Sequence, residues 1–150
     1  MSMDENSPSE SPRLMGLDVG NRRIGVAVSD ALGLTAQPVL TLVRSNRRQD
    51  LKSLLRLIRK HGCTEIVVGN PLYMSGDQSP QAAKTQGFAE MLREETGLPV
   101  HLWDERLTTT EAHRHLHESG VAGSDHRALV DQVAAVLILQ SFLDARAYRG

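Results

Sequence analysis

Hydrophobic positions along the chain follow two spacings, one typical of strands and one typical of helices. Short apolar runs bounded by glycine, proline or polar residues predict five β-strands. These strands cover residues 13–19, 24–29, 35–43, 65–69 and 100–104. Pro38 lacks an N–H donor, so the third strand is expected at an edge of the sheet or at a bulge. The link Gly20-Asn21-Arg22-Arg23 is short and rich in turn residues, which suits a hairpin between the first two strands.

Other segments place apolar residues three and four positions apart and therefore predict helices. These helices cover residues 49–61, about 80–96, about 108–119 and about 125–147. Gly62 closes the first helix, and Thr108-Thr109-Thr110-Glu111 has the pattern of a capping box that opens the third. A three-stranded meander followed by strand–helix units predicts an α/β fold, in which a mixed five-stranded sheet is flanked by helices.

Length and composition agree with one domain in a reducing compartment. The chain has 150 residues, and residues 1–12 are rich in serine, proline and acids without the features of a signal peptide. We therefore expect a disordered N-terminal tail and one domain over residues 13–150. The single cysteine, Cys63, excludes an intramolecular disulfide and indicates a cytoplasmic protein. No apolar run approaches the ~20 residues that span a bilayer, so no membrane partner is expected.

Positive charge is local, although the net charge of the whole chain is only −1. The tail holds three acids and no Lys or Arg, so residues 13–150 alone carry a net charge of +2. Seven basic residues lie between positions 44 and 60, against the single acid Asp50. Four of them form a stripe opposite the leucines of the first helix: Arg48, Lys52, Arg56 and Arg59. Such a stripe can track a phosphate backbone, but a solvated helix face is the more common explanation.

Three acids interrupt apolar elements and form the candidate catalytic site. Asp18 ends the first strand, Glu105 follows the last strand, and Asp131 lies on a largely apolar face of the final helix. A buried carboxylate is costly unless a metal ion or a hydrogen-bond partner compensates for its desolvation. Small residues beside Asp131 permit close approach to the strand that holds Asp18, and catalytic groups in open sheets gather beyond the carboxyl ends of strands. The three carboxylates can therefore meet.

All-oxygen ligands favour hard cations, so the expected cofactor is Mg²⁺ or Mn²⁺. Two such ions can stabilise the attacking water and the leaving oxygen of a phosphodiester, which predicts a two-metal nuclease. Each acid also has a simpler explanation. Asp18 could cap a turn or helix, Glu105 could pair with Arg106, and Asp131 could pair with Arg127, one helical turn earlier.

Several strings of the sequence resemble the YqgF family, also called RuvX, the Holliday-junction-resolvase-like nucleases. The strings are residues 16–20, 23–30, 104–109 and 130–135, together with Gly69, Pro71, Met74 and Gly76 in the loop. The resemblance implies a ribonuclease-H-like fold and a metal-dependent nuclease with the acidic triad Asp18, Glu105 and Asp131. It further implies a role in 5′-end maturation of precursor 16S ribosomal RNA, in ribosome biogenesis, or in processing of branched or single-stranded DNA.

Polar residues around the triad are the candidate nucleic-acid contacts. Those predicted are Arg22, Arg23, Asn70, Tyr73, Arg106 and Arg127. Arg22 and Arg23 lie in the turn after Asp18, and Tyr73 is the one aromatic residue expected to be exposed in the loop. Arg106 can neutralise a transition state or simply pair with Asp104. Zinc binding by His113 and His117 is disfavoured, because neither a following Glu nor a Cys cluster accompanies them.

Two other classes of protein compete with the nuclease prediction. Actin-like and sugar-kinase ATPases share the Asp-x-Gly turn, but they need two such lobes to enclose a nucleotide. A non-catalytic nucleic-acid-binding or ribosome-associated module of the same fold is the second alternative. The sequence leaves open whether the substrate is precursor rRNA or DNA, whether cleavage is internal or terminal, and whether the protein is a monomer or a homodimer.

Overall fold

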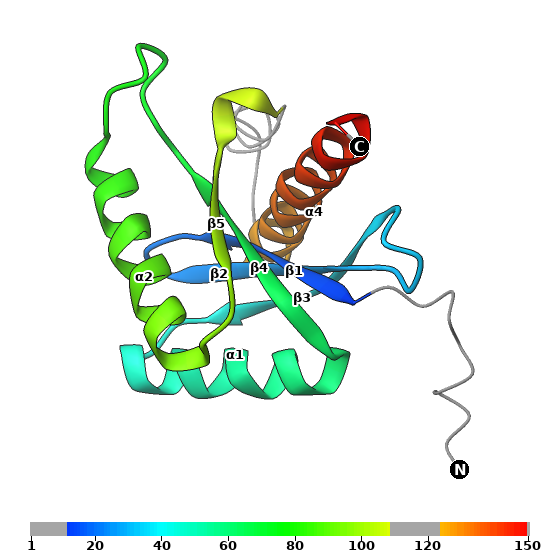
Figure 1. Ribbon diagram of the computed structural model, residues 1–150. Helices are drawn as coiled ribbons and strands as arrows, with labels where there is room; N and C mark the ends of the chain where they lie inside the picture. The colour runs from blue at the N-terminus through cyan, green and yellow to red at the C-terminus, as the bar shows by residue number, and fades with distance from the viewer. Residues whose placement is uncertain (1–11, 109–123, 150) are drawn as a thin grey trace.

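A single five-stranded sheet forms the centre of the computed structural model, which describes residues 12–108 and 124–149 (Figure 1). The strands are β1 (Arg13–Val19), β2 (Arg23–Ser29), β3 (Ala36–Val43), β4 (Cys63–Asn70) and β5 (Val100–Asp104). Their spatial order is β3-β2-β1-β4-β5. The β1–β2 and β2–β3 pairs are antiparallel, and the β1–β4 and β4–β5 pairs are parallel. The prediction of a mixed five-stranded sheet is confirmed.

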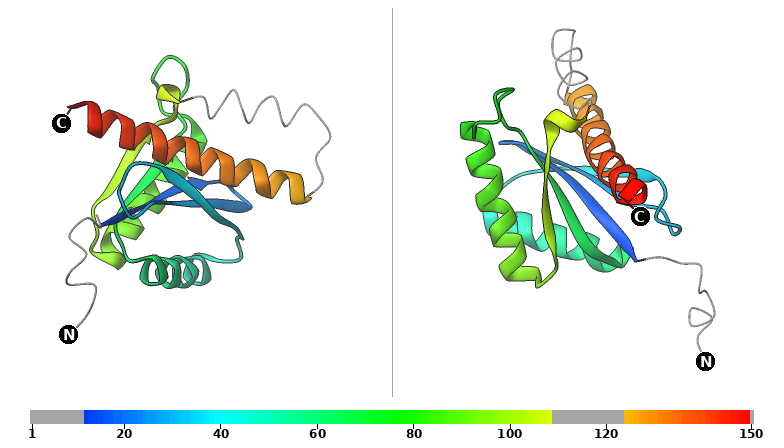
Figure 2. Two further views of the ribbon diagram at one scale, coloured as in Figure 1. Left: turned by 90° about the vertical axis from the view of Figure 1, so that its right-hand side faces the viewer. Right: turned by 45° about the horizontal axis from the view of Figure 1, so that its top comes forward.

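Helices cover both faces of this sheet (Figure 2). They are α1 (Arg47–His61), α2 (Pro80–Thr96) and α4 (Ser124–Arg149), with a short 3₁₀ turn, η2 (Glu105–Leu107). The first two lie on one face, and α4 crosses the other. Helix α1 begins two residues earlier than predicted, because the Asn46 side chain accepts a hydrogen bond from the Gln49 N–H and caps it.

Several sequence predictions fall outside the described residues. They are most of the disordered tail over residues 1–12, most of the third helix with its capping box, and the histidines His113 and His117. The prediction for Pro38 can be tested. Strand β3 is an edge strand, and its pairing with β2 shifts register where Ala27 faces Pro38. The edge and the bulge both occur, as the missing N–H requires.

Helix α4 is the most apolar of the α-helices that the structure describes. Over Arg127–Tyr148 it is long and apolar enough to cross a membrane by length and composition alone, so the expectation that no run approaches this length is wrong. However, Ala134, Ile138 and Leu139 of this segment are fully buried within the domain. A core helix packed on a sheet has the same composition, and the absence of a membrane partner stays a prediction.

The two faces of the sheet are packed differently. Toward α1 and α2 the strands present large side chains such as Met15 and Leu17. Toward α4 they present glycine where the helix comes closest. A Cβ at Gly25 would lie 2.0 Å from the backbone oxygen of Asp131, and one at Gly16 would lie 2.6 Å from the Leu139 Cβ. Glycine therefore lets the backbone of α4 rest directly on β1 and β2.

Candidate active site at the carboxyl edge of the sheet

Two buried carboxylates lie where β1, β4 and β5 end. Asp18 is 7% exposed, and strand alternation places it on the same face as Gly16, toward α4. Glu105 is 2% exposed and begins the 3₁₀ turn after β5. Its Oε2 atom lies 2.9 Å from where a Cβ of Gly69 in β4 would stand. Since β1 and β4 are adjacent parallel strands, Asp18 and Glu105 occupy one edge of the sheet, as predicted.

Asp131 reaches the same edge from α4. Its backbone oxygen lies over Gly25, the residue that pairs with Asp18 across β1 and β2. Its side chain is 15% exposed, and Oδ2 accepts a 2.6 Å hydrogen bond from Arg23 Nε. The alternative pairing with Arg127 is therefore wrong, because the partner of Asp131 is Arg23 at the start of β2, 108 residues away in sequence.

The simple explanation offered for Glu105 also fails. The guanidinium of Arg106 pairs with Asp104, through Nη2 at 2.6 Å and Nε at 3.0 Å from Oδ2. This pairing holds the pKa of Asp104 below its usual range. Glu105 instead lies buried, with its Oε2 atom beside Gly69. The surface pairing with Arg106 is therefore excluded, and the role of Glu105 as a metal ligand stays a prediction.

The three acids have the chemistry that a hard cation requires, but the structure does not bring them together into a complete metal-binding site. All three are oxygen donors, which suits Mg²⁺ or Mn²⁺. Among the described residues, however, no group of three or more His, Cys, Asp or Glu is placed to hold one metal ion. Arg23 Nε donates a hydrogen bond to Oδ2 of Asp131. Coordination of a metal ion by Asp18, Glu105 and Asp131 stays a prediction.

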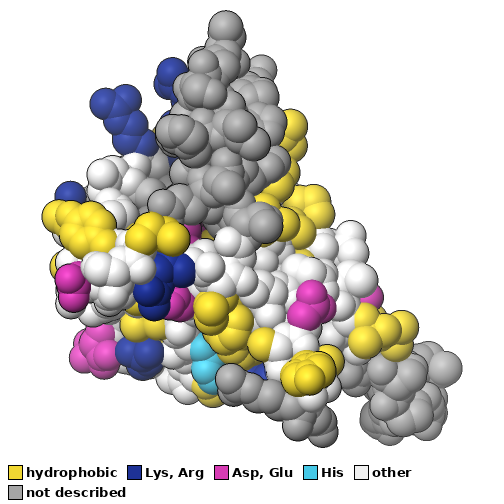
Figure 3. All heavy atoms as spheres, turned by 90° about the horizontal axis from the view of Figure 1, so that it is seen from above, with side chains coloured by type: hydrophobic (Ala, Val, Ile, Leu, Met, Phe, Trp, Pro, Cys, Tyr) yellow, Lys and Arg dark blue, Asp and Glu magenta, His cyan; other side chains and the backbone are white. Residues whose placement is uncertain are grey.

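Arg106 holds the loop that follows β4. Its Nη1 donates to the backbone oxygen of Met74 at 3.1 Å, while Asp104 takes the other side of the guanidinium. The loop carries Tyr73, which is exposed as predicted. On the left of the described surface seen from above, basic and acidic side chains lie next to one another (Figure 3). In this conformation Arg106 positions a loop, and its direct contact with nucleic acid stays a prediction.

The remaining predicted contacts are spread around the edge. Arg22 and Arg127 are exposed, and neither makes an ion pair within the described residues. Asn70 ends β4, and its buried Oδ1 has no hydrogen-bond partner among the described residues. Strand alternation places Asn70 on the face of Val68, opposite to the carboxylates. The structure therefore separates Asn70 from the triad.

Sequence reasoning missed the role of Arg44, which it counted only as one charge among seven. Arg44 Nη1 donates to the Gly20 carbonyl at 2.8 Å, and Nε donates to Asp50 Oδ2 at 3.0 Å. Its guanidinium also lies over the Phe88 ring, 5.1 Å from the centroid. Arg44 thus fixes the turn that follows Asp18. No local pattern could show this, because its partners lie on three other segments of the chain.

Comparison with known protein families identifies relatives over almost the whole chain. The sequence model described as RuvX, Holliday junction resolvase, matches residues 12–145. A protein of Moorella thermoacetica is 49% identical over 138 residues, which cover 92% of this chain and 99% of that protein. A protein of Koribacter versatilis is 50% identical over 134 residues, covering 89% and 88%. Both carry the provisional name pre-16S rRNA nuclease.

Solved structures show the same architecture at low sequence identity. RuvC of Thermus thermophilus in complex with a Holliday junction substrate superposes with a TM-score of 0.59 at 14% identity, over 90% of this chain and 96% of that one. A second RuvC structure from the same organism gives 0.53 at 15% identity, over 91% and 96%. The fold is therefore ribonuclease-H-like, as expected from the sequence.

Proposed function

The chain belongs to the RuvX family of nucleases, and we propose that it cleaves precursor 16S ribosomal RNA during 5′-end maturation, with Mg²⁺ or Mn²⁺ as cofactor. The observation that carries the proposal is the burial of Asp18 and Glu105 at one edge of the sheet, with Asp131 brought over the same edge by α4. The provisional names of the relatives support precursor rRNA as the substrate. We place the reaction in the cytoplasm, in keeping with a single, buried and unpaired Cys63.

The chain contributes three carboxylates to this chemistry, together with one arginine that can exchange its carboxylate partner for a phosphate. A bound divalent cation supplies charge stabilisation at the phosphate and lowers the pKa of an attacking water. Asp18, Glu105 and Asp131 are the residues that would hold it. The guanidinium of Arg23 now pairs with Asp131, and a phosphate is a competing partner for it, because arginine binds phosphate oxygens in the same forked geometry. Binding of substrate by Arg23 would free the Asp131 oxygen.

Cleavage of four-way DNA junctions is the second candidate, favoured by the description of the family as Holliday junction resolvases. The two candidates make different demands on assembly. Symmetrical cutting of a junction needs two active sites and therefore a homodimer. Maturation of one RNA end needs a single site, for which a monomer suffices. Measuring the oligomeric state together with substrate preference thus separates the two.

The test is a cleavage assay of the purified protein on labelled precursor 16S 5′-leader RNA, single-stranded DNA and a four-way junction. We expect cleavage of the RNA with Mg²⁺ or Mn²⁺, little with Ca²⁺ and none with excess EDTA. Asp18→Asn and Glu105→Gln should each lower the rate by about two to four orders of magnitude, because a metal ion contributes several kcal/mol to transition-state stabilisation. Calorimetry should show weaker Mn²⁺ binding in both variants.

Asp30→Asn is the matched control. Asp30 is also an aspartate at a strand end, but it follows β2 at the opposite end of the sheet. Its carboxylate accepts hydrogen bonds from the Leu34 and Thr35 N–H groups and so caps the β2–β3 turn. The control should cleave and bind Mn²⁺ like the wild type. Cleavage that survives EDTA, or an Asp18→Asn variant as active as Asp30→Asn, would overturn the proposal.

A further inference from the structure

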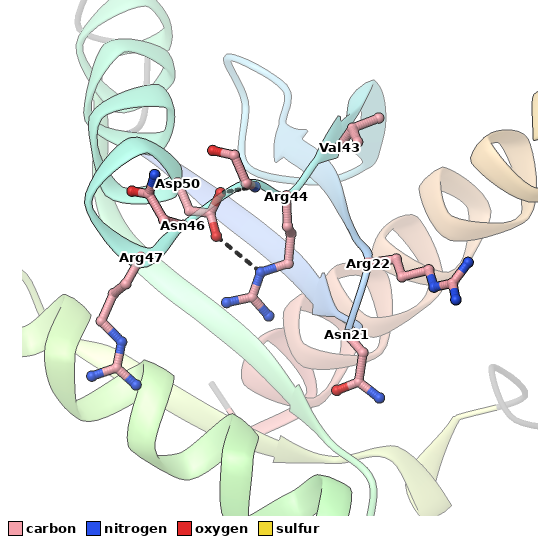
Figure 4. A pocket seen from close by; sticks show the side chains of 8 residues that line it. Asn21, Arg22, Val43, Arg44, Asn46, Arg47 and Asp50 are labelled. Carbon is pink, nitrogen blue, oxygen red and sulfur yellow. Dashed lines mark hydrogen bonds and ion pairs between the residues drawn. The ribbon is translucent and has the colours of Figure 1, made fainter.

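A basic groove adjoins the β1–β2 turn. One cavity of about 480 Å³ lies between this turn and the start of α1 (Figure 4), and a second of about 360 Å³ continues toward α2. Asn21, Arg44 and Arg47 line both, so the two cavities are neighbours on the surface. We name the two cavities together the turn groove.

Positive charge exceeds negative charge among the residues that line the turn groove. Its basic residues are Arg22, Arg44, Arg47 and Lys84. Asp50 is the one acid that lines it, and Asp50 is buried and accepts hydrogen bonds from Arg44 and the Ser45 N–H. The other three cations are exposed and make no ion pair within the described part of the chain. A polyanion in the groove would therefore meet three available charges.

Arg44, at the centre of the turn groove, is held by contacts on several sides. Arg44 is held at both sides of its guanidinium, by the Gly20 carbonyl and by Asp50, and it stacks on Phe88. In Figure 4, Arg47 extends from the start of α1 toward α2, while Arg22 extends from the turn in the other direction. The free cations thus stand on either side of a fixed centre. Charges presented on fixed elements bind with less loss of conformational entropy than charges on mobile loops.

The turn groove begins at the active-site edge. Asn21, which lines both cavities, is three residues beyond Asp18, and Gly20 between them is hydrogen-bonded to Arg44. The one aromatic residue that lines the groove, Phe88, is buried beneath Arg44 and offers no ring for base stacking. The groove therefore suits phosphates and carries no base-reading group of that kind.

We propose that the turn groove binds the phosphate backbone of the substrate strand on one side of the cut, with Arg22, Arg47 and Lys84 as its phosphate contacts. This inference rests on the proposed nuclease function and adds a path for the strand. The basic stripe on α1 competes as a phosphate track. Its Lys52, Arg56 and Arg59 line a separate cavity of about 230 Å³ that shares no lining residue with the turn groove.

Two triple variants with equal loss of charge distinguish these surfaces. One carries Arg22→Gln, Arg47→Gln and Lys84→Gln, and the matched control carries Lys52→Gln, Arg56→Gln and Arg59→Gln. Binding of a fluorescent single-stranded oligouridylate is measured over a range of salt concentrations, in an Asp18→Asn background that prevents cutting. We expect the groove variant to bind about 10- to 100-fold more weakly at low salt. The slope of log affinity against log salt should flatten by about 2, since each single-strand phosphate contact contributes about 0.7.

The control variant should stay within about twofold of its parent in affinity and keep its slope. Equal weakening by both triple variants, or an unchanged slope in the groove variant, would overturn the inference. Melting curves of both variants show whether either loss comes from unfolding. Because binding is measured without turnover, the experiment tests phosphate binding in the turn groove separately from catalysis. A wild type that cleaves RNA while the groove variant binds normally leaves the proposed function intact and removes the groove from it.

Discussion

The two faces of the sheet are built by the same strands but contact their helices in different ways. In β1, Met15, Leu17 and Val19 point toward α1 and α2 and belong to a core of large apolar side chains. The alternate positions, including Gly16 and Asp18, face α4. On the first face, side chains fill space between sheet and helices. On the second, absent side chains allow a helix backbone to touch the strands, and this contact sets where Asp131 stands.

The difference teaches that stability and position are separable in this fold. A side-chain core tolerates loss of volume at a cost in free energy, because neighbouring side chains partly relax into the space. A backbone contact cannot relax in that way, since an added methyl group meets a carbonyl of the helix itself. Substitutions on the α4 face should therefore disturb the active site, whereas substitutions within the apolar core toward α1 and α2 should disturb stability alone.

Gly25→Ala should have the largest effect. Its Cβ would stand 2.0 Å from the Asp131 backbone oxygen and 2.5 Å from the carbonyl carbon, so α4 must move away from β2. We expect a loss of at least about 3 kcal/mol in the free energy of unfolding, at or beyond the upper end for overpacking. We also expect nuclease activity to fall by at least tenfold at temperatures where the variant is folded. Chemical denaturation and cleavage assays measure the two, and wild-type activity in a folded variant would contradict the positional role.

Leu54→Ala, which removes a side chain from the core on the opposite face of the sheet, should have the second-largest effect. Leu54 lies on α1, is fully buried and packs in the core with Ile58 and Leu57. Removing three buried carbon atoms should cost about 2–5 kcal/mol in unfolding free energy. The rate of cleavage at saturating substrate should stay within about twofold of wild type below the melting transition, because α1 carries none of the three carboxylates. A loss of rate comparable to that of Gly25→Ala would show that the two faces are not separable.

The local parts of this architecture were predictable from the sequence. Alternating and helical spacings located all five strands and the described helices to within a few residues. The spacings have this power because each element places its apolar residues on the face that it buries. Pro38 predicted an edge strand or a bulge because it lacks a backbone N–H donor, and strand β3 has both features. Apolar strands that end in an acid predicted that Asp18 and Glu105 share an edge, since parallel strands end together.

Long-range pairings in the site were not predictable. Asp131 was expected to pair one helical turn back, but its partner is Arg23 in the first hairpin. Nothing in the spacing of residues fixes which of two nearby arginines reaches a carboxylate, because that depends on how α4 is rotated and how closely it approaches. Arg44 gave no signal for the same reason, and its partners came together only through the packing of β3, α1 and α2.

Glu65→Gln tests the second contact that positions α4, at the end of the helix remote from the active site. Glu65 accepts hydrogen bonds from both terminal nitrogens of Arg146 in α4 and contacts His101 at 2.6 Å. The Arg146 guanidinium, with a smaller contribution from His101, lowers the pKa of Glu65 from 4.5 to about 2. We expect the variant to lose about 1–2 kcal/mol of unfolding free energy at pH 7, allowing for solvent screening of a partly exposed pair.

The pH dependence of that loss follows from the sign of the shift. Because the folded-state pKa of Glu65 lies below the unfolded value, the carboxylate stabilises the fold fully above about pH 4.5. This stabilisation is lost as the pH falls from about 4.5 through 2, because the carboxyl group is fully protonated in both states only below the folded-state pKa. Urea denaturation across this window should show the stabilities of wild type and variant converging as the pH falls. A gap in stability that stays constant from pH 7 down to pH 2 would rule out the ionic contact as its source.

Gly87→Ala should have the smallest effect and the opposite sign, which isolates what glycine does on the α4 face. Gly87 lies within α2 on an exposed surface, and a Cβ built there meets nothing within 4 Å. Since glycine inside a helix is less favourable than alanine, the substitution should raise the unfolding free energy by about 0.5–1 kcal/mol and the melting temperature by about 2–4 °C. The same chemical change thus stabilises where a glycine has open space and destabilises at Gly25, where the helix backbone fills it. A Gly87→Ala variant that melts below wild type would mean that this fold also requires the backbone freedom of glycine at a position where no close contact is present.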